Sequence, residues 1–468
     1  MVITFLGACR QVTGSAYLLE HNGQRFLIDC GLYQERPYLE RNWNPFPVEP
    51  EGLQGLILTH AHLDHSGLTP KVVRDGFKGP IYTTPITADL IPIVLLDSAR
   101  LQEEDAAYKR KRHALEGRKG PYPEIPLYTE EDVNLVKPLL TIVDYNQKIS
   151  LSQNLSFEFH DAGHILGSAM VEVKVKDKIG WRNLIFTGDI GQKDKPLVNN
   201  PTFFASADAV VMEATYGDRS HEDPADIQTM LAKIINETVE AGGNIVIPTF
   251  AVERAQEVLF YLSLLTRSKR IPPLLCFLDS PMALEVTRVF ENHRERMDEE
   301  TQNLFRRRQD PFHFPGLKMV RTTEESKAIN HIRGSCLIMA GAGMCTGGRI
   351  KHHLVHNISR PESTILFVGY QAPGTLGRQI LDGHGEVRIL GQSLAVRARI
   401  AQIEGFSAHA DQGFLLEWLK AFHRPPDKIF LTHGEGEVLE RFSQTVSEHL
   451  PATIVIPEYK EKYSLFQD

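Results

Sequence analysis

The stretch Thr59-His60-Ala61-His62-Leu63-Asp64-His65-Ser66-Gly67 places four metal-binding side chains within six residues, directly after an apolar run. Residues two apart in an extended segment point the same way, so His60 and His62 can face one metal together. A turn into a helix at Asp64 and His65 would direct those two side chains toward a second metal. Imidazole with carboxylate suits Zn²⁺, and Mn²⁺ or iron stays open. The stretch predicts a metal centre at the end of a strand.

Two metals need more ligands than this one loop provides. His164, Asp189 and His433 each follow a short apolar run of strand length. A single histidine after a strand is often structural. Three such side chains at strand ends, taken with the histidine-rich loop, predict a dinuclear site.

The spacing of apolar runs changes along the chain. Up to about residue 200 the runs are short and β-like, apart from one helical region from Ile86 to Glu116. From Ala209–Glu213 onward, strand-length runs alternate with amphipathic segments such as Pro224–Glu240, which predicts a parallel, doubly wound sheet. After residue 395 the earlier pattern returns, with a predicted strand at Val396–Ile403. We therefore expect the tail to rejoin the first domain around an inserted α/β domain.

Composition limits the class of protein. The chain has 468 residues, 42% of them apolar, and a net charge of −8. No run of apolar residues is long enough for a membrane span. The first residues contain neither a basic stretch nor a long apolar stretch, so we expect no secretory signal. The five cysteines are widely spaced without a CxxC pair, which favours a reducing compartment. We expect a cytoplasmic protein with no membrane partner.

Motifs along the whole chain resemble one family. The HxHxDH loop, with the downstream histidine and Gly-Asp, looks like the metallo-β-lactamase fold. The motifs beginning at Glu213, Ser407 and His433 resemble those of the β-CASP ribonucleases, relatives of the mRNA 3′-end cleavage endonuclease. The resemblance implies an α/β fold, an αββα sandwich with an inserted doubly wound β-CASP domain. It implies three segments: residues 1–208 and 395–468 in the metallo-β-lactamase domain and 209–394 in the insertion.

The resemblance also implies a role for each motif residue. Two Zn²⁺ ions are expected. One would be held by His60, His62 and His164, the other by Asp64, His65 and His433, and both by Asp189. Asp29 would orient the ligand loop, Glu213 would hydrogen-bond His433, and His409 would be the general acid.

The implied activity is hydrolysis of single-stranded RNA by a hydroxide that the two metals activate, leaving 5′-phosphate and 3′-hydroxyl ends. Endonuclease action is expected, with a 5′–3′ exonuclease mode and a homodimer left open. Glycines and polar residues at the strand ends of the insertion are candidates for phosphate contacts, because they permit close backbone approach or can donate hydrogen bonds. The candidates are Thr249, Arg254, Ser280, Gly341, Gly343, Gly347, Gly348, Gly374 and Arg378.

Other functions stay open at this point. A small-molecule metallo-hydrolase of the same fold would lack the insertion and His409. An inactive RNA-binding scaffold would usually have lost metal ligands, whereas every ligand position is filled here. The basic runs Lys109–Arg112 and Arg306–Arg308 are either solvated helix faces or borders of an RNA path. A DNA nuclease also remains an alternative.

Overall fold

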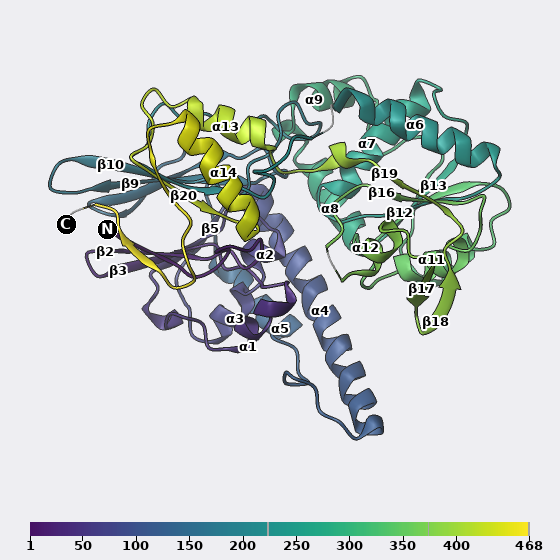
Figure 1. The fold of residues 1–468 in the computed structure, drawn as a ribbon, viewed down its shortest axis with the longest axis horizontal. Coiled ribbons are helices and arrows are strands. Elements are labelled where there is room, and N and C mark those ends of the chain that lie inside the picture. The colour runs from purple at the N-terminus through teal and green to yellow at the C-terminus, as the bar shows by residue number, and fades with distance from the viewer. Residues whose placement is uncertain (222–223, 373, 467–468) are drawn as a thin grey trace. The chain divides into compact units, whose positions relative to one another are not determined.

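The computed structural model describes residues 1–221, 224–372 and 374–466, and the chain divides into two compact units (Figure 1). The first unit consists of Met1–Lys193, Asn200–Ser220 and His409–Asp468. The second consists of Asp194–Asn199 and His221–Ala408. The first unit is therefore assembled from both ends of the chain.

Two seven-stranded sheets form the first unit. One has the order β22-β1-β2-β3-β4-β5-β6, with β1 (Val2–Phe5), β2 (Tyr17–His21), β3 (Gln24–Ile28), β4 (Gly55–Ile57), β5 (Ile81–Thr83), β6 (Leu140–Ile142) and β22 (Lys462–Ser464). The other has the order β21-β20-β11-β10-β9-β8-β7, with β7 (Ile149–Ser152), β8 (Leu155–Asp161), β9 (Ala169–Lys176), β10 (Trp181–Phe186), β11 (Ala209–Glu213), β20 (Lys428–Thr432) and β21 (Thr453–Val455).

The core of the first unit lies between these sheets. Phe5 of one sheet lies 5.0 Å from Phe430 of the other, measured between ring centroids, and Tyr17 lies 5.7 Å from Phe186. All four side chains are buried. Because alternate residues of a strand point to opposite faces, each strand contributes every second side chain to this core.

Helices cover the outer faces of both sheets. In Figure 1, α13 (Gln412–Lys420) and α14 (Gly436–His449) lie over the second sheet, where Trp418 and Phe442 are buried. Helices on the first sheet's side are α1 (Glu40–Trp43), α2 (Leu63–Ser66), α3 (Thr69–Arg74), α4 (Pro85–Glu116) and α5 (Glu130–Val136). The predicted αββα sandwich is confirmed.

Helix α4 agrees with the predicted helical region from Ile86 to Glu116. The Thr84 side chain accepts a hydrogen bond from the Thr87 amide at its start. Gly117, with φ 62°, ends it in the left-handed conformation that glycine adopts without steric cost.

The second unit contains a parallel sheet of order β14-β13-β15-β12-β16-β19. Its strands are β12 (Ile245–Pro248), β13 (Leu275–Asp279), β14 (Leu317–Met319), β15 (Cys336–Ala340), β16 (Thr364–Phe367) and β19 (Arg399–Gln402), with a separate hairpin of β17 (Glu386–Ile389) and β18 (Gln392–Ala395). Its helices are α6 (Pro224–Glu240), α7 (Arg254–Arg267), α8 (Pro281–Asn292), α9 (Glu299–Arg306), α10 (Thr323–Ile329), α11 (Ile350–Asn357) and α12 (Leu376–Leu381). The predicted doubly wound insertion is confirmed as a fold class.

Short 3₁₀ turns connect several of these elements. They are η1 (Arg36–Tyr38), η2 (Pro50–Gly52), η3 (Lys137–Leu139), η4 (Arg294–Arg296) and η5 (Glu404–Phe406).

Two strands lie in a different unit from the one expected. The run Ala209–Glu213 was predicted to open the insertion, but as β11 it pairs with β10 and β20 in the first unit. The run Val396–Ile403 was predicted to rejoin the first domain, but its residues Arg399–Gln402 form β19, which pairs with β16 in the second unit. Both are buried or half-buried parallel strands, whose sequences do not encode the sheet that they join. The exact domain boundaries remain a prediction.

Candidate metal centre

The predicted metal ligands lie at strand ends of the first unit. His60 follows β4, and the next three ligands, His62, Asp64 and His65, lie at the start of α2 or within it. His164 lies in the turn between β8 and β9. Asp189 comes after β10 and His433 comes directly after β20. The sandwich therefore brings together side chains that are up to 373 positions apart in the sequence.

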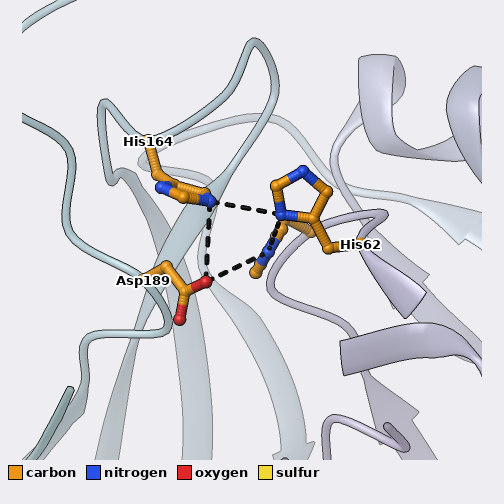
Figure 2. Close-up of side chains that lie close together, drawn as sticks. His62, His164 and Asp189 are labelled. Atoms are coloured by element: carbon orange, nitrogen blue, oxygen red, sulfur yellow. Dashed lines mark hydrogen bonds and ion pairs between the residues drawn. The ribbon is translucent and has the colours of Figure 1, made fainter. Parts of the chain in front are cut away.

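Three histidines and one carboxylate form the first group. The Nε2 atom of His60 lies 3.1 Å from Nδ1 of His62, which lies 3.2 Å from Nε2 of His164. The Oδ2 atom of Asp189 lies 3.5 Å from Nε2 of both His60 and His164. Figure 2 shows His62, His164 and Asp189 pointing toward one common centre. These atoms outline a small tetrahedron.

The second group contains Asp64, His65 and His433. The Nε2 atoms of His65 and His433 are 3.1 Å apart, and Nε2 of His433 lies 3.4 Å from Oδ2 of Asp64. The other oxygen of Asp189, Oδ1, lies 3.2 Å from His65 Nε2 and 3.6 Å from His433 Nε2. Asp189 therefore presents one oxygen to each group.

Close packing of the backbone positions Asp189. Gly188 precedes it with φ 53°, and a Cβ atom at this position would lie 3.0 Å from Cβ of Thr59. Such contacts are shorter than real Cβ atoms normally make, so a side chain at residue 188 would displace either Asp189 or the loop that carries His60. Glycine is required here for both conformation and space.

Asp29 orients the loop between β4 and α2. Its Oδ1 accepts a hydrogen bond from the Thr59 amide and its Oδ2 one from the Thr59 hydroxyl, each at 2.8 Å. The same Oδ2 lies 2.7 Å from Nδ1 of His65. The carboxylate fixes a proton on Nδ1 and leaves the Nε2 lone pair of His65 facing the second group. Thr59 Oγ1 also lies 3.1 Å from Nδ1 of His60, so Asp29 reaches His60 through this hydroxyl.

Glu213 differs from the expectation that it hydrogen-bonds His433. It accepts a hydrogen bond from the Thr215 hydroxyl at 2.6 Å, and it is Thr215 Oγ1 that lies 3.0 Å from Nδ1 of His433. The Thr215 hydroxyl thus links the Glu213 carboxylate to the His433 ring, so Glu213 acts on His433 through Thr215. Thr59 and Thr215 were not predicted as site residues. Their positions in the sequence could have indicated them, because Thr59 directly precedes the histidine-rich loop and Thr215 lies two residues after Glu213.

His409 lies beside the first group. Its Nδ1 is 3.1 Å from both carboxylate oxygens of Glu213 and 3.9 Å from Oδ2 of Asp189. The ring centroid of His409 lies 4.5 Å from that of His164. The side chain is 21% exposed, in contrast to the buried histidines around it. Because Nδ1 faces Glu213, the Nε2 side of the ring is directed away from that carboxylate.

Burial lowers the pKa of some histidines in the site, whereas neighbouring carboxylates raise the pKa of others. Burial lowers the pKa of His60 and His164 well below the usual value, and that of His62 to about 4. Burial also opposes protonation of His65, but the carboxylates of Asp189 and Asp29 outweigh it and raise its pKa well above the usual value. The first group therefore offers neutral imidazoles, which is the state that binds metals. His65 would instead release its Nε2 proton when a metal binds, since a ligating imidazole must have a free lone pair.

The pKa of His409 is raised to about 9. Burial opposes protonation of this imidazole, but the negative charges of Glu213 and Asp189 outweigh that effect. The ring accordingly carries a proton at neutral pH. A partly exposed imidazolium held by two carboxylates can donate that proton.

The donor atoms of the first group fit a tetrahedral cation. Ligands about 2.05 Å from a central ion stand about 3.3 Å apart at a tetrahedral angle. The distances of 3.1, 3.2, 3.5 and 3.5 Å in the first group match this spacing. Neutral imidazole lone pairs that converge in this way repel one another unless a cation lies between them. The residues present therefore suit a metal.

Several of the predicted phosphate contacts gather at one edge of the second unit's sheet. A Cβ atom on Gly341 would lie 3.7 Å from both the Ser280 hydroxyl and the Thr249 carbonyl oxygen. Gly343 lies against the ring of Phe250, a side chain that is 41% exposed and was not predicted as part of the site. These positions follow β12, β13 and β15, as expected for the carboxyl ends of parallel strands.

The other predicted phosphate contacts differ from one another in burial and in the partners that they bind. Arg254 is buried, and its Nη1 donates to Glu257 at 2.6 Å, while its Nε has no partner among the described residues. Arg378 donates to Asp382 at 2.8 Å on the exposed side of α12. Gly374 and Gly348 have positive φ values of 80° and 73°. Gly347 has open space where a Cβ would point.

Three known domain profiles match the chain in order. The metallo-beta-lactamase superfamily matches residues 9–146, the Beta-Casp domain residues 255–380, and the Zn-dependent metallo-hydrolase RNA specificity domain residues 393–457. The chain is 39% identical to Ribonuclease TTHA0252 of Thermus thermophilus over 94% of both chains. This chain belongs to the β-CASP ribonuclease family of the metallo-β-lactamase superfamily.

Other relatives of this β-CASP protein carry different names. It is 33% identical to Transcription termination factor FttA of Methanosarcina mazei, covering 96% of this chain and 69% of that one. It is 29% identical to an RNase J-like protein of Methanocaldococcus jannaschii over 98% of each. A crystal structure of a protein of unknown function from Enterococcus faecalis shares the fold, with a TM-score of 0.54 at 14% identity over 99% of both chains. No helix within the described residues has the length and apolar character needed to span a bilayer.

Proposed function

We propose that this β-CASP protein is a zinc-dependent ribonuclease that cleaves single-stranded RNA internally and leaves 5′-phosphate and 3′-hydroxyl ends. The observation that carries the proposal is Asp189, whose two oxygens face two separate groups of nitrogen and oxygen donors. A carboxylate shared between two ligand sets would hold two metals close together, as two-metal phosphodiesterases use them. The similarity to Ribonuclease TTHA0252 supports RNA as the substrate.

Two Zn²⁺ ions would be held by the two groups, with His60, His62 and His164 on one side and Asp64, His65 and His433 on the other. When bound, the ions supply Lewis-acid activation of water and positive charge opposite the phosphate. Asp29 and Thr215 would keep the Nε2 atoms of His65 and His433 turned inward, since each binds the opposite ring nitrogen.

His409 would protonate the leaving 3′-oxygen of the upstream nucleotide. Glu213 holds Nδ1 of this ring through both of its oxygens, so the proton available for transfer is the one on Nε2. The raised pKa keeps that proton in place at neutral pH. General acid catalysis of this kind contributes about 10²- to 10⁴-fold to the rate.

RNA phosphates would contact the strand-end residues of the second unit, in particular Ser280, Gly341 and Gly343. The exposed ring of Phe250 offers a face on which a base can stack. Neither contact reads a base edge. We therefore expect cleavage that depends more on single-strandedness than on sequence.

The test uses 5′- and 3′-labelled single-stranded RNA and matching DNA, with wild type, His409→Ala and Asp64→Ala, with and without a chelator. Cleavage of RNA that is lost with chelator, restored by Zn²⁺ and absent in both variants is expected. The downstream product should be digested by a 5′-phosphate-dependent exonuclease. His423→Ala, an exposed histidine elsewhere in the first unit, is the matched control and should retain full activity.

Two outcomes would contradict the proposal. Full activity of Asp64→Ala would rule out the two-metal arrangement. Cleavage of the DNA alone would rule out the ribonuclease assignment.

A further inference from the structure

The second half of helix α4 carries an exposed apolar stripe. Leu101, Tyr108 and Leu115 are 53%, 62% and 82% exposed, and they are spaced seven residues apart. A seven-residue spacing returns to nearly the same side of a helix after two turns. The three side chains therefore form one line about 21 Å long, at 1.5 Å per residue.

The opposite side of α4 is already packed. Ala106 and His113 are buried, and Nδ1 of His113 lies 2.5 Å from Glu124 in the segment that follows the helix. Tyr128 of the same segment donates to Ser98 at 2.8 Å. At 100° per residue, Ala106 and His113 lie about 120–180° around the helix from the three stripe residues, and Ser98 lies about 60–100° from them. The helix is thus held in place from one side and presents Leu101, Tyr108 and Leu115 on the other.

Charge along α4 is divided about Tyr108. Acidic residues precede it, including Glu104 and Asp105, and the basic run Lys109–Arg112 follows it. Asp105 pairs with Lys109 within the helix. The side chains of Glu104 and Lys111, which lie next to the apolar stripe, form no ion pair or hydrogen bond within the described part of the chain.

The exposed side of α4 is complementary to the same side of a second α4 that runs in the opposite direction. If two α4 helices run antiparallel about a twofold axis at Tyr108, Leu101 of one copy faces Leu115 of the other. The acidic Glu104 of each copy then faces Lys111 of its partner, and the two tyrosines meet at the axis. A twofold interface pairs a surface with itself, so every contact away from the axis occurs twice.

We propose that α4 is a self-association surface, through which two copies of this chain pair antiparallel along Leu101, Tyr108 and Leu115. The mixed charge favours a second copy over RNA as the occupant. An RNA backbone would be repelled by Glu104 and Asp105. A second, antiparallel α4 would instead place its basic residues opposite the acidic half and its acidic residues opposite the basic half. The stripe lies outside the metal centre, so the inference does not depend on the proposed ribonuclease activity.

A contact between two single helices is small. Interfaces of stable dimers bury about 1,200–2,000 Å² in total, and a helix pair of this length lies at or below the lower end. The dimer should therefore form reversibly, with an average mass in solution that rises toward twice the monomer mass as the protein reaches tens to hundreds of micromolar.

Sedimentation of the full chain, with charge reversals, tests the proposal. Glu104→Lys and Lys111→Glu should each weaken self-association at least tenfold, because each puts like charges together at two symmetric places. The double variant Glu104→Lys/Lys111→Glu should regain wild-type association. A one-to-one mixture of the two single variants should associate more tightly than either alone. Residues 104 and 111 are about 10 Å apart along one helix, so rescue cannot come from a pair within the same chain.

An apolar substitution gives a second, independent measurement. Leu115→Ser should weaken the dimer, while Leu135→Ser, which changes a leucine 52% exposed on α5, should not. All these positions are exposed, so folding should be retained. A wild type that stays monomeric at about 200 μM would overturn the proposal. So would a mixture of the single variants that associates no better than its components, or a Lys111→Glu variant that loses RNA affinity with self-association unchanged.

Discussion

Thr215→Val is the substitution that tests the hydroxyl relay between Glu213 and His433. Valine keeps the shape of threonine but removes the donor to Glu213 at 2.6 Å and the contact with His433 Nδ1 at 3.0 Å. The His433 ring would then be free to rotate or to change its tautomer, and Nε2 would no longer be fixed toward Asp64 and His65. We expect the second metal position to weaken while the first is unchanged.

The expected loss of Zn²⁺ affinity in Thr215→Val follows from the hydrogen bonds that the substitution removes. A hydrogen bond to a charged group contributes about 1.5–3 kcal/mol, and the contact with the neutral ring adds about 0.5–1.5 kcal/mol. Part of this is recovered where water reaches the half-buried Thr215. A net loss of about 1.4–2.8 kcal/mol corresponds to a 10- to 100-fold weaker second Zn²⁺, the range typical of residues that orient a metal ligand.

The assay is a competition titration of metal-stripped protein with Zn²⁺ and a chromophoric chelator, which resolves two dissociation constants. Thr215→Ser retains the hydroxyl and should bind both ions within about threefold of wild type. Thr453→Val, a threonine exposed on β21, is the matched control. If Thr215→Val binds both ions as tightly as wild type, the relay does not orient His433 and the reasoning is wrong.

Three further outcomes are expected. His409→Ala should lower kcat about 10²- to 10⁴-fold while the bound zinc, measured by mass spectrometry, stays at the wild-type amount; a parallel loss of zinc would show that His409 is a ligand instead. Adding Zn²⁺ at 100 times its dissociation constant should stabilise the stripped protein by about 2.7 kcal/mol per site, and a calorimetric melting temperature that does not rise would refute binding to the folded state. Burial opposes ionisation of Glu172, but hydrogen bonds from His160, Lys174 and Asn183 lower its pKa to about 2. The ionised Glu172 therefore stabilises the folded state by at most about 3 kcal/mol, and this contribution is full above pH 4.5 and is lost as the pH falls toward 2. The difference in urea stability between wild type and Glu172→Gln should shrink over that interval. A difference that stayed constant would contradict the argument.

The elements with strong local signals could be predicted from the sequence. Helix α4 has a threonine cap, a proline in its first turn and a glycine at its end, and its bounds agree with prediction within one residue. The metal-binding side chains could be predicted as a group because four of them lie in one short loop and the others each follow a strand-length apolar run. Their convergence on two metals was implied by the resemblance to the metallo-β-lactamase fold.

Contacts that depend on sheet partners could not be predicted in the same way. The strand β11 is uniformly apolar, and nothing in Ala209–Glu213 says that it joins β10 and β20 instead of β12. The position of Thr215 between Glu213 and His433 depends on β11 and β20 being neighbours, although they are over 200 residues apart. The exposed stripe on α4 could not be predicted either, because its sequence does not show that Leu101, Tyr108 and Leu115 are left uncovered by the rest of the unit.

The central claim is that two cations share Asp189 in one pocket. Anomalous diffraction at the zinc edge, from crystals of the zinc-loaded protein, tests it most directly. The account predicts two peaks about 3.5–4 Å apart, one beside His60, His62 and His164 and the other beside Asp64, His65 and His433. A single peak, or two peaks of which neither contacts Asp189, would contradict it.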